Sequence, residues 1–186
     1  MAFKKSTLLG VLAATSSYPF VLVSIILSPW FNLFDDALSD LGNVSANAPI
    51  AYIFNAGTML SGLFVVAFAI LTSSGHRGWK FLIWTLPLIS TGISLALVGI
   101  FPINTGIIHG IVSVAFFVMM IITMLVYSFS SWLLGSPRSG AVALALGISS
   151  VLIWSATWPW DGVAIQEALT TALASLWLIM ISRQNT

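Results

Sequence analysis

The sequence is poor in charged residues and contains no cysteine. Lys, Arg, Asp and Glu make up 6% of its 186 residues, whereas a soluble domain carries about 25%. So few charges cannot solvate the surface of a water-soluble globule, while 59% hydrophobic residues exclude intrinsic disorder. The net charge of +1 gives no electrostatic basis for binding nucleic acid, and the absence of cysteine excludes disulfides, cysteine-ligated zinc and iron–sulfur clusters. The class that remains is a polytopic membrane protein.

Long hydrophobic runs occupy most of the chain. A membrane-spanning helix needs about 20 apolar residues, and six stretches meet that requirement, at about 6–28, 49–73, 81–101, 106–133, 140–158 and 163–182. No linker or change of composition separates them, so the sequence predicts a single all-α domain over residues 1–186. Pro19 is expected to bend the first helix, because proline removes a backbone donor. Small residues four apart are expected at helix interfaces, and such pairs are Gly106/Gly110, Ala143/Gly147 and Ala168/Ala172.

The few charged residues are distributed unequally over this topology. All basic residues fall at one end of the six predicted helices: Lys4, Lys5, Arg77, Lys80, Arg138 and Arg183. All acidic residues fall at or near the opposite end: Asp35, Asp36, Asp40, Asp161 and Glu167. Because basic residues mark the cytoplasmic side of membrane proteins, the sequence predicts a multi-pass protein of the cell membrane with both termini in the cytoplasm.

The middle of the predicted bundle lacks ionisable residues. No Lys, Arg, Asp, Glu or His lies near the centre of any span, which argues against a retinal Schiff base, a midplane carboxylate relay and a voltage sensor. His76 and His109 are separated by nearly the hydrocarbon thickness of about 30 Å, so they cannot share a haem iron. The sequence therefore predicts no cofactor and no high-affinity metal site.

Polar residues gather instead at the acidic end. The candidate cluster consists of Asp36, Asp40, Asn55, Asn104, His109 and Glu167. This inventory suits a divalent cation or a His–carboxylate acid–base pair. The alternative is structural, with Asp161 capping the last helix, Asp40 capping a short turn, Asn104 forming a turn and His109 donating to a loop carbonyl. We expect His109 and Glu167 to hydrogen-bond to each other, directly or through Asp40.

Four short motifs at this end resemble a known family. Asp40 lies in a segment that resembles an "SDLG" signature, and Asn55 in one that resembles an "iFN-x-G" motif. His109 follows a Phe-Pro pair, and Glu167 stands in an acidic beginning of the sixth helix. The segments are Phe34–Asn43, Ile53–Gly57, Phe101-Pro102 and Ala164–Glu167, where Gln166 replaces a more usual small residue or proline. In this order they resemble the "domain of unknown function 998" group, a six-helix prokaryotic membrane family well represented in archaea.

The resemblance implies that Asp40, Asn55, His109 and Glu167 are the recurring polar positions of that family, which has no established activity. Three functions stay open. The first is a membrane protein whose polar cluster binds a small ligand, a lipid headgroup or an ion, or stabilises the bundle for a partner. The second is a membrane-embedded hydrolase or lipid-modifying enzyme that uses His109 with Asp40 or Glu167. The third is a small-solute transporter. The lipid bilayer is the expected environment, nucleic acid is not an expected partner, and a homo-oligomer or a membrane-complex partner is left open.

Overall fold

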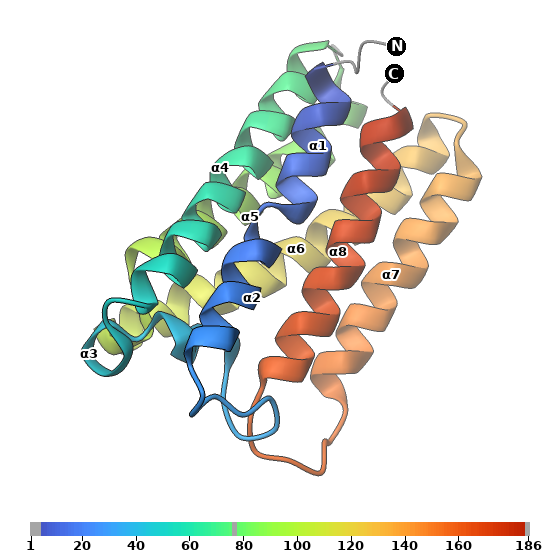
Figure 1. The fold of residues 1–186 in the computed structure, drawn as a ribbon. Coiled ribbons are helices and arrows are strands. Elements are labelled where there is room, and N and C mark those ends of the chain that lie inside the picture. The colour runs from blue at the N-terminus through green and yellow to red at the C-terminus, as the bar shows by residue number, and fades with distance from the viewer. Residues whose placement is uncertain (1–4, 76–77, 185–186) are drawn as a thin grey trace.

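The computed structural model describes residues 5–75 and 78–184, which form a bundle of helices without strands (Figure 1). The first span comprises α1 (Lys5–Thr15) and α2 (Ser17–Leu27). The others are α4 (Ala51–Gly75), α5 (Trp79–Ile100), α6 (Ile107–Leu133), α7 (Pro137–Ser155) and α8 (Ala164–Gln184). Short elements complete the chain: η1 (Leu38–Gly42), α3 (Val44–Asn47) and η2 (Ile103–Thr105). Six spans in the described part are long and apolar enough to cross a membrane, which confirms the predicted all-α fold.

The first span is interrupted near its middle. Ser16 separates α1 from α2, and its amide donates to the Leu12 carbonyl at 2.9 Å. Pro19 has no N–H to donate to the carbonyl of Thr15, four residues earlier, and its ring crowds that carbonyl. The interruption therefore lies where proline is expected to act.

The spans form a ring, in which α1 lies between α4 and α8. Each helix from α4 to α8 packs on the next, and α1 packs on both α4 and α8. The start of α1 and the end of α8 lie together at one end of the bundle (Figure 1), where the Thr7 hydroxyl donates to the Ser182 carbonyl at 3.2 Å. We call this the terminal end, and the opposite one, which carries η1, α3 and η2, the acidic end. Beyond the interruption, α2 continues along α4.

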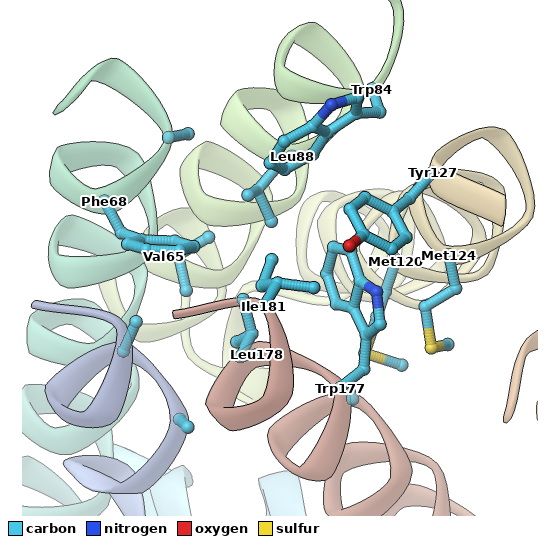
Figure 2. Close-up of a cluster of buried hydrophobic side chains, with 14 of the residues drawn as sticks. Val65, Phe68, Trp84, Leu88, Met120, Met124, Tyr127, Trp177, Leu178 and Ile181 are labelled. Atoms are coloured by element: carbon cyan, nitrogen blue, oxygen red, sulfur yellow. The ribbon is translucent and has the colours of Figure 1, made fainter. Parts of the chain in front are cut away.

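Aromatic side chains fill the centre of the bundle toward its terminal end. Trp84, Tyr127 and Trp177 face one another from α5, α6 and α8, with ring centroids 5.1 to 6.4 Å apart and nearly perpendicular planes (Figure 2). Such edge-to-face packing is favoured by the charge distribution of aromatic rings. Phe68 and Leu88 are buried beside them. The largest buried aromatic side chains therefore lie in the half of the bundle that contains the termini.

Glycines allow α4 and α5 to approach closely. A Cβ atom on Gly62 would lie 2.5 Å from the carbonyl oxygen of Gly92, and one on Gly92 would lie 2.8 Å from that of Gly62. The prediction of a tight interface at Gly106 and Gly110 is wrong, since a Cβ at either would meet no described atom within 4 Å. The prediction for Gly147 is confirmed, because it packs against Leu125 of α6.

Candidate functional site

The long connection at the acidic end docks onto the beginning of α8. The Gly162 amide donates to the Phe34 carbonyl at 2.8 Å, and the amides of Val163 and Ala164 donate to the Asp36 carbonyl at 3.1 and 3.0 Å. These bonds satisfy donors that every helix leaves free at its N-terminus. The expected capping role of Asp161 is wrong, because Asp161 is exposed and the Asp36 backbone takes this role.

Two acidic residues bind backbone amides at the beginning of η1. The Glu167 carboxylate of α8 accepts a hydrogen bond from the Leu38 amide at 2.6 Å, and the Asp40 carboxylate accepts one from the Ala37 amide at 2.8 Å. Glu167 is 9% exposed, and the two amides bound by Glu167 and Asp40 belong to consecutive residues. The fold thus brings together two of the predicted site residues.

Three other predicted residues hold separate backbone atoms of the same connection. Asn55 donates from buried α4 to the Gly42 carbonyl at 3.0 Å. The exposed Asn104 accepts from the Val44 amide at 3.1 Å. The Asp36 carboxylate accepts from the Asn32 amide at 2.7 Å. Asp36, Asn55 and Asn104 therefore each bind a different backbone atom of the same connection, and their side chains do not form one common site.

His109 is buried in the first turn of α6 and has its own partners. Its Nδ1 lies 2.7 Å from the Phe101 carbonyl oxygen, and its Nε2 lies 3.1 Å from the Ser113 hydroxyl. Since neither bond goes to Glu167 or Asp40, the expected His109–Glu167 hydrogen bond is wrong. The second histidine, His76, lies outside the described residues.

A cavity of about 230 Å³ lies inside the half of the bundle nearer the acidic end. Its sides are α2 and α8, its back is formed by α4, α5 and α6, and Trp177 lines it toward the aromatic core. At the acidic end it is bordered by Leu38, Ser39 and Glu167. Two lining residues are exposed, Tyr18 of α2 at 41% and Leu33 of the connection after α2 at 43%, so the cavity opens to the surface beside α2.

The cavity wall is mostly apolar, and Glu167 lies at its end. Threonine hydroxyls of the wall donate to carbonyls of their own helix, as Thr58 does to Asn55 and Thr91 does to Pro87. Glu167 is the only charged side chain among the lining residues, all of which lie in the described part. Sequence reasoning missed the cavity, because its wall consists of ordinary apolar and hydroxyl side chains.

Metal ligands are not grouped at this site. In residues 5–75 and 78–184 no set of three or more His, Asp or Glu side chains is arranged to hold a metal ion. The carboxylates at η1 and the imidazole of His109 each hydrogen-bond to backbone groups of the protein.

Comparison with protein families matches residues 11–184 to the family described as "Protein of unknown function (DUF998)". The chain belongs to this family. No curated protein and no solved structure matches it. In this DUF998 protein, three of the short motifs noted from the sequence contact one another. Asn55 and Glu167 both hydrogen-bond to η1, which contains the Ser-Asp-Leu-Gly segment. Gly42 of that segment is needed because a Cβ there would collide with the Asn55 side chain.

Proposed function

We propose that this protein binds one chain of a membrane amphiphile in the cavity between α2 and α8. The observation that carries the proposal is the pairing of an apolar cavity of about 230 Å³ with a single carboxylate at its end. An engineered apolar cavity of about 150 Å³ binds benzene, so this one accommodates a single alkyl chain. The opening beside α2 allows the chain to enter from the bilayer. The site is complete within one chain and requires no second copy.

Selectivity for the amphiphile rests on its head group. An alkyl chain gains little by leaving lipid for the cavity, because both surroundings are apolar. The contact with Glu167 therefore discriminates among ligands. This carboxylate accepts hydrogen bonds and lies near Asp40, so the head group is a donor, a hydroxyl or an ammonium, rather than a carboxylate or a phosphate.

We infer an orientation in which this site lies in the outer half of the bilayer. The basic residues Lys5, Lys80, Arg138 and Arg183 lie at or beyond the helix ends of the terminal end, by their positions in the helices. By the positive-inside rule this end is cytoplasmic, and the acidic end faces outward. We infer from this a plasma-membrane protein that takes its ligand from the outer leaflet.

The proposal is tested with an alkyl alcohol that carries a photoreactive diazirine in its chain. After irradiation of the purified protein, mass spectrometry is expected to locate adducts on the cavity-facing parts of α2, α4 and α8. Ala168→Phe fills the cavity that Ala168 lines and is expected to abolish these adducts. Ala145→Phe adds the same ring on an exposed face of α7 and is expected to leave them unchanged.

The head group is tested with probes of the same chain length. The amine should label like the alcohol, and the fatty acid should not, because its carboxylate is repelled by Glu167. Glu167→Gln is expected to weaken labelling by the amine by about tenfold, the magnitude of one charge-assisted hydrogen bond. Equal labelling by the fatty acid would show that the head-group assignment is wrong. Adducts spread evenly over the lipid-facing surface would show that the cavity binds no amphiphile.

A further inference from the structure

A serine–histidine pair lies beside the cavity. His109 and Ser113 are one turn apart on α6, and the Ser113 oxygen lies 3.1 Å from His109 Nε2. On the other side of the ring, Nδ1 lies 2.7 Å from the Phe101 carbonyl oxygen. His109 is 5% exposed, while Ser113 is among the residues that line the cavity.

The carbonyl of Phe101 determines which nitrogen of His109 carries the proton. A carbonyl oxygen accepts hydrogen bonds and cannot donate them, so Nδ1 is the protonated nitrogen of the neutral ring. Nε2 then presents a lone pair to the Ser113 hydroxyl, which donates to it. A hydroxyl paired with an imidazole that a third group orients is the arrangement that activates serine nucleophiles.

Two other serines of the cavity have a backbone carbonyl as their acceptor instead. The hydroxyl of Ser175 donates to the Ala14 carbonyl at 2.7 Å, and that of Ser61 donates to the Ala13 carbonyl at 3.2 Å. A carbonyl cannot take a proton from serine near neutral pH, whereas an imidazole can. Ser113 is therefore chemically distinct from Ser61 and Ser175 within the same cavity.

We propose that Ser113 is an acyl-accepting nucleophile and His109 its general base, and that the substrate is an ester of the amphiphile held in the cavity. The choice of substrate rests on the proposed function, whereas the reactivity of the pair does not. Ser113 and Glu167 line the same cavity, so one ligand can contact both residues. An ester that joins the head group to the chain would lie between these two contacts.

The reaction proceeds in two balanced steps. The Ser113 oxygen bonds to the ester carbonyl carbon while Nε2 of His109 takes the hydroxyl proton. The carbon–oxygen bond to the alcohol breaks, and the departing oxygen takes that proton from Nε2. Water then attacks the acyl-serine, gives one proton through His109 to the Ser113 oxygen, and releases the fatty acid. The products are one alcohol and one carboxylic acid.

The test uses a fluorophosphonate with a long alkyl chain, which bonds covalently to activated serines and accumulates even when turnover is slow. Peptide mapping of the labelled wild-type protein is expected to find the adduct on Ser113 and not on Ser175, the comparison serine within the same cavity. Ser113→Ala should abolish labelling. His109→Gln should slow it by about 100-fold, the usual contribution of a general base. Ser149→Ala, on an exposed part of α7, should label like the wild type.

Each outcome is decisive for one of the two proposals. No adduct on Ser113, or equal adducts on Ser113 and Ser175 of the wild type, would overturn the nucleophile assignment without requiring any variant to fold. Labelling of His109→Gln at the wild-type rate would overturn the role of His109. If the diazirine alcohol labels the cavity while the fluorophosphonate does not, amphiphile binding stands and the reaction fails. If a short-chain fluorophosphonate labels Ser113 while the alcohol does not bind, the reactivity of Ser113 stands and amphiphile binding fails.

Discussion

Glu167 binds the backbone of η1 and also lines the cavity. Its carboxylate accepts the Leu38 amide at 2.6 Å and so fastens η1 to α8, and it also forms the charged end of the cavity. A carboxylate has about four lone-pair sites, so the bond to Leu38 leaves capacity for the head group of a ligand. The structural role of Glu167 and its proposed binding role can therefore be separated by substitution.

Glu167→Ala is expected to lower the free energy of unfolding by about 2 kcal/mol, because it leaves the partly buried Leu38 amide without an acceptor. Glu167→Gln keeps a side-chain oxygen at this position and should cost less than half as much. Asp161→Ala, which removes an exposed acid of the neighbouring turn, should have no measurable effect. Unfolding of the purified protein in mixed detergent measures all three. Equal losses for the Gln and Ala variants would contradict the structural role of the Leu38 bond.

The polar residues were predictable as a group but not as pairs. Asp40, Asn55, His109 and Glu167 could be assigned to one end from their positions in the spans. Their partners are mostly backbone atoms, namely the Gly42 and Phe101 carbonyls and the Leu38 amide. A backbone group is present at every residue and so gives no sequence signal. For the same reason Ser113, one serine among many, did not stand out.

At the scale of helices, close packing depends on glycines that a spacing rule does not identify. Gly62 and Gly92 let α4 and α5 meet backbone to backbone, although they lie on different helices and form no four-residue pair. Gly106 and Gly110 have the expected spacing, but nothing in the described chain packs on them. The spacing of small residues shows where helices can approach, and the fold decides where they do.

Gly62→Ala is expected to lower the stability of the bundle by about 1–3 kcal/mol, because the added methyl group would overlap the α5 backbone. Gly110→Ala makes the same change where space is free and should raise stability by about 0.5 kcal/mol through helix propensity. Thermal melting of the two variants against the wild type provides the measurement. A Gly62→Ala protein as stable as Gly110→Ala would show that α4 and α5 are not in backbone contact.

The part of the first span that follows the interruption forms one wall of the cavity. Pro19 removes one hydrogen bond from the helix, and after Ser16 the chain continues as α2 along α4. The cavity is bordered by α2 residues, including Val21 and Ile25, opposite α8. One link joins α2 to α8, where the Tyr18 hydroxyl donates to the Ser175 hydroxyl at 3.0 Å. A local break in one helix thus contributes to an internal space and its opening.

At the scale of the whole molecule, the charges divide between the two ends of the bundle. The described acids and bases lie at opposite ends, and the start of α1 and the end of α8 are together (Figure 1). The proposed orientation with cytoplasmic termini follows from the basic end. It also decides from which leaflet the cavity would receive its ligand.

The absence of cysteine makes this orientation directly measurable. Thr157→Cys, in the exposed connection before α8, and Ser136→Cys, in the exposed turn before α7, leave the charges unchanged. A membrane-impermeant maleimide added to intact cells is expected to label Thr157→Cys at once and Ser136→Cys only after permeabilisation. The unsubstituted protein supplies the blank. The reverse pattern would invert the proposed topology and place the cavity in the inner leaflet.

Composition and hydrophobic run length determined by themselves that this chain is all-helical with six spans, because the bilayer requires about 20 apolar residues in each helix. The short motifs also indicated the family to which the chain belongs. Only the tertiary structure decided that α2 and α8 enclose a cavity, that Glu167 ends it and that His109 faces Ser113 rather than Glu167. The physical reason is that hydrophobicity acts on each segment separately, whereas a cavity and its hydrogen-bond partners arise from how separate segments pack.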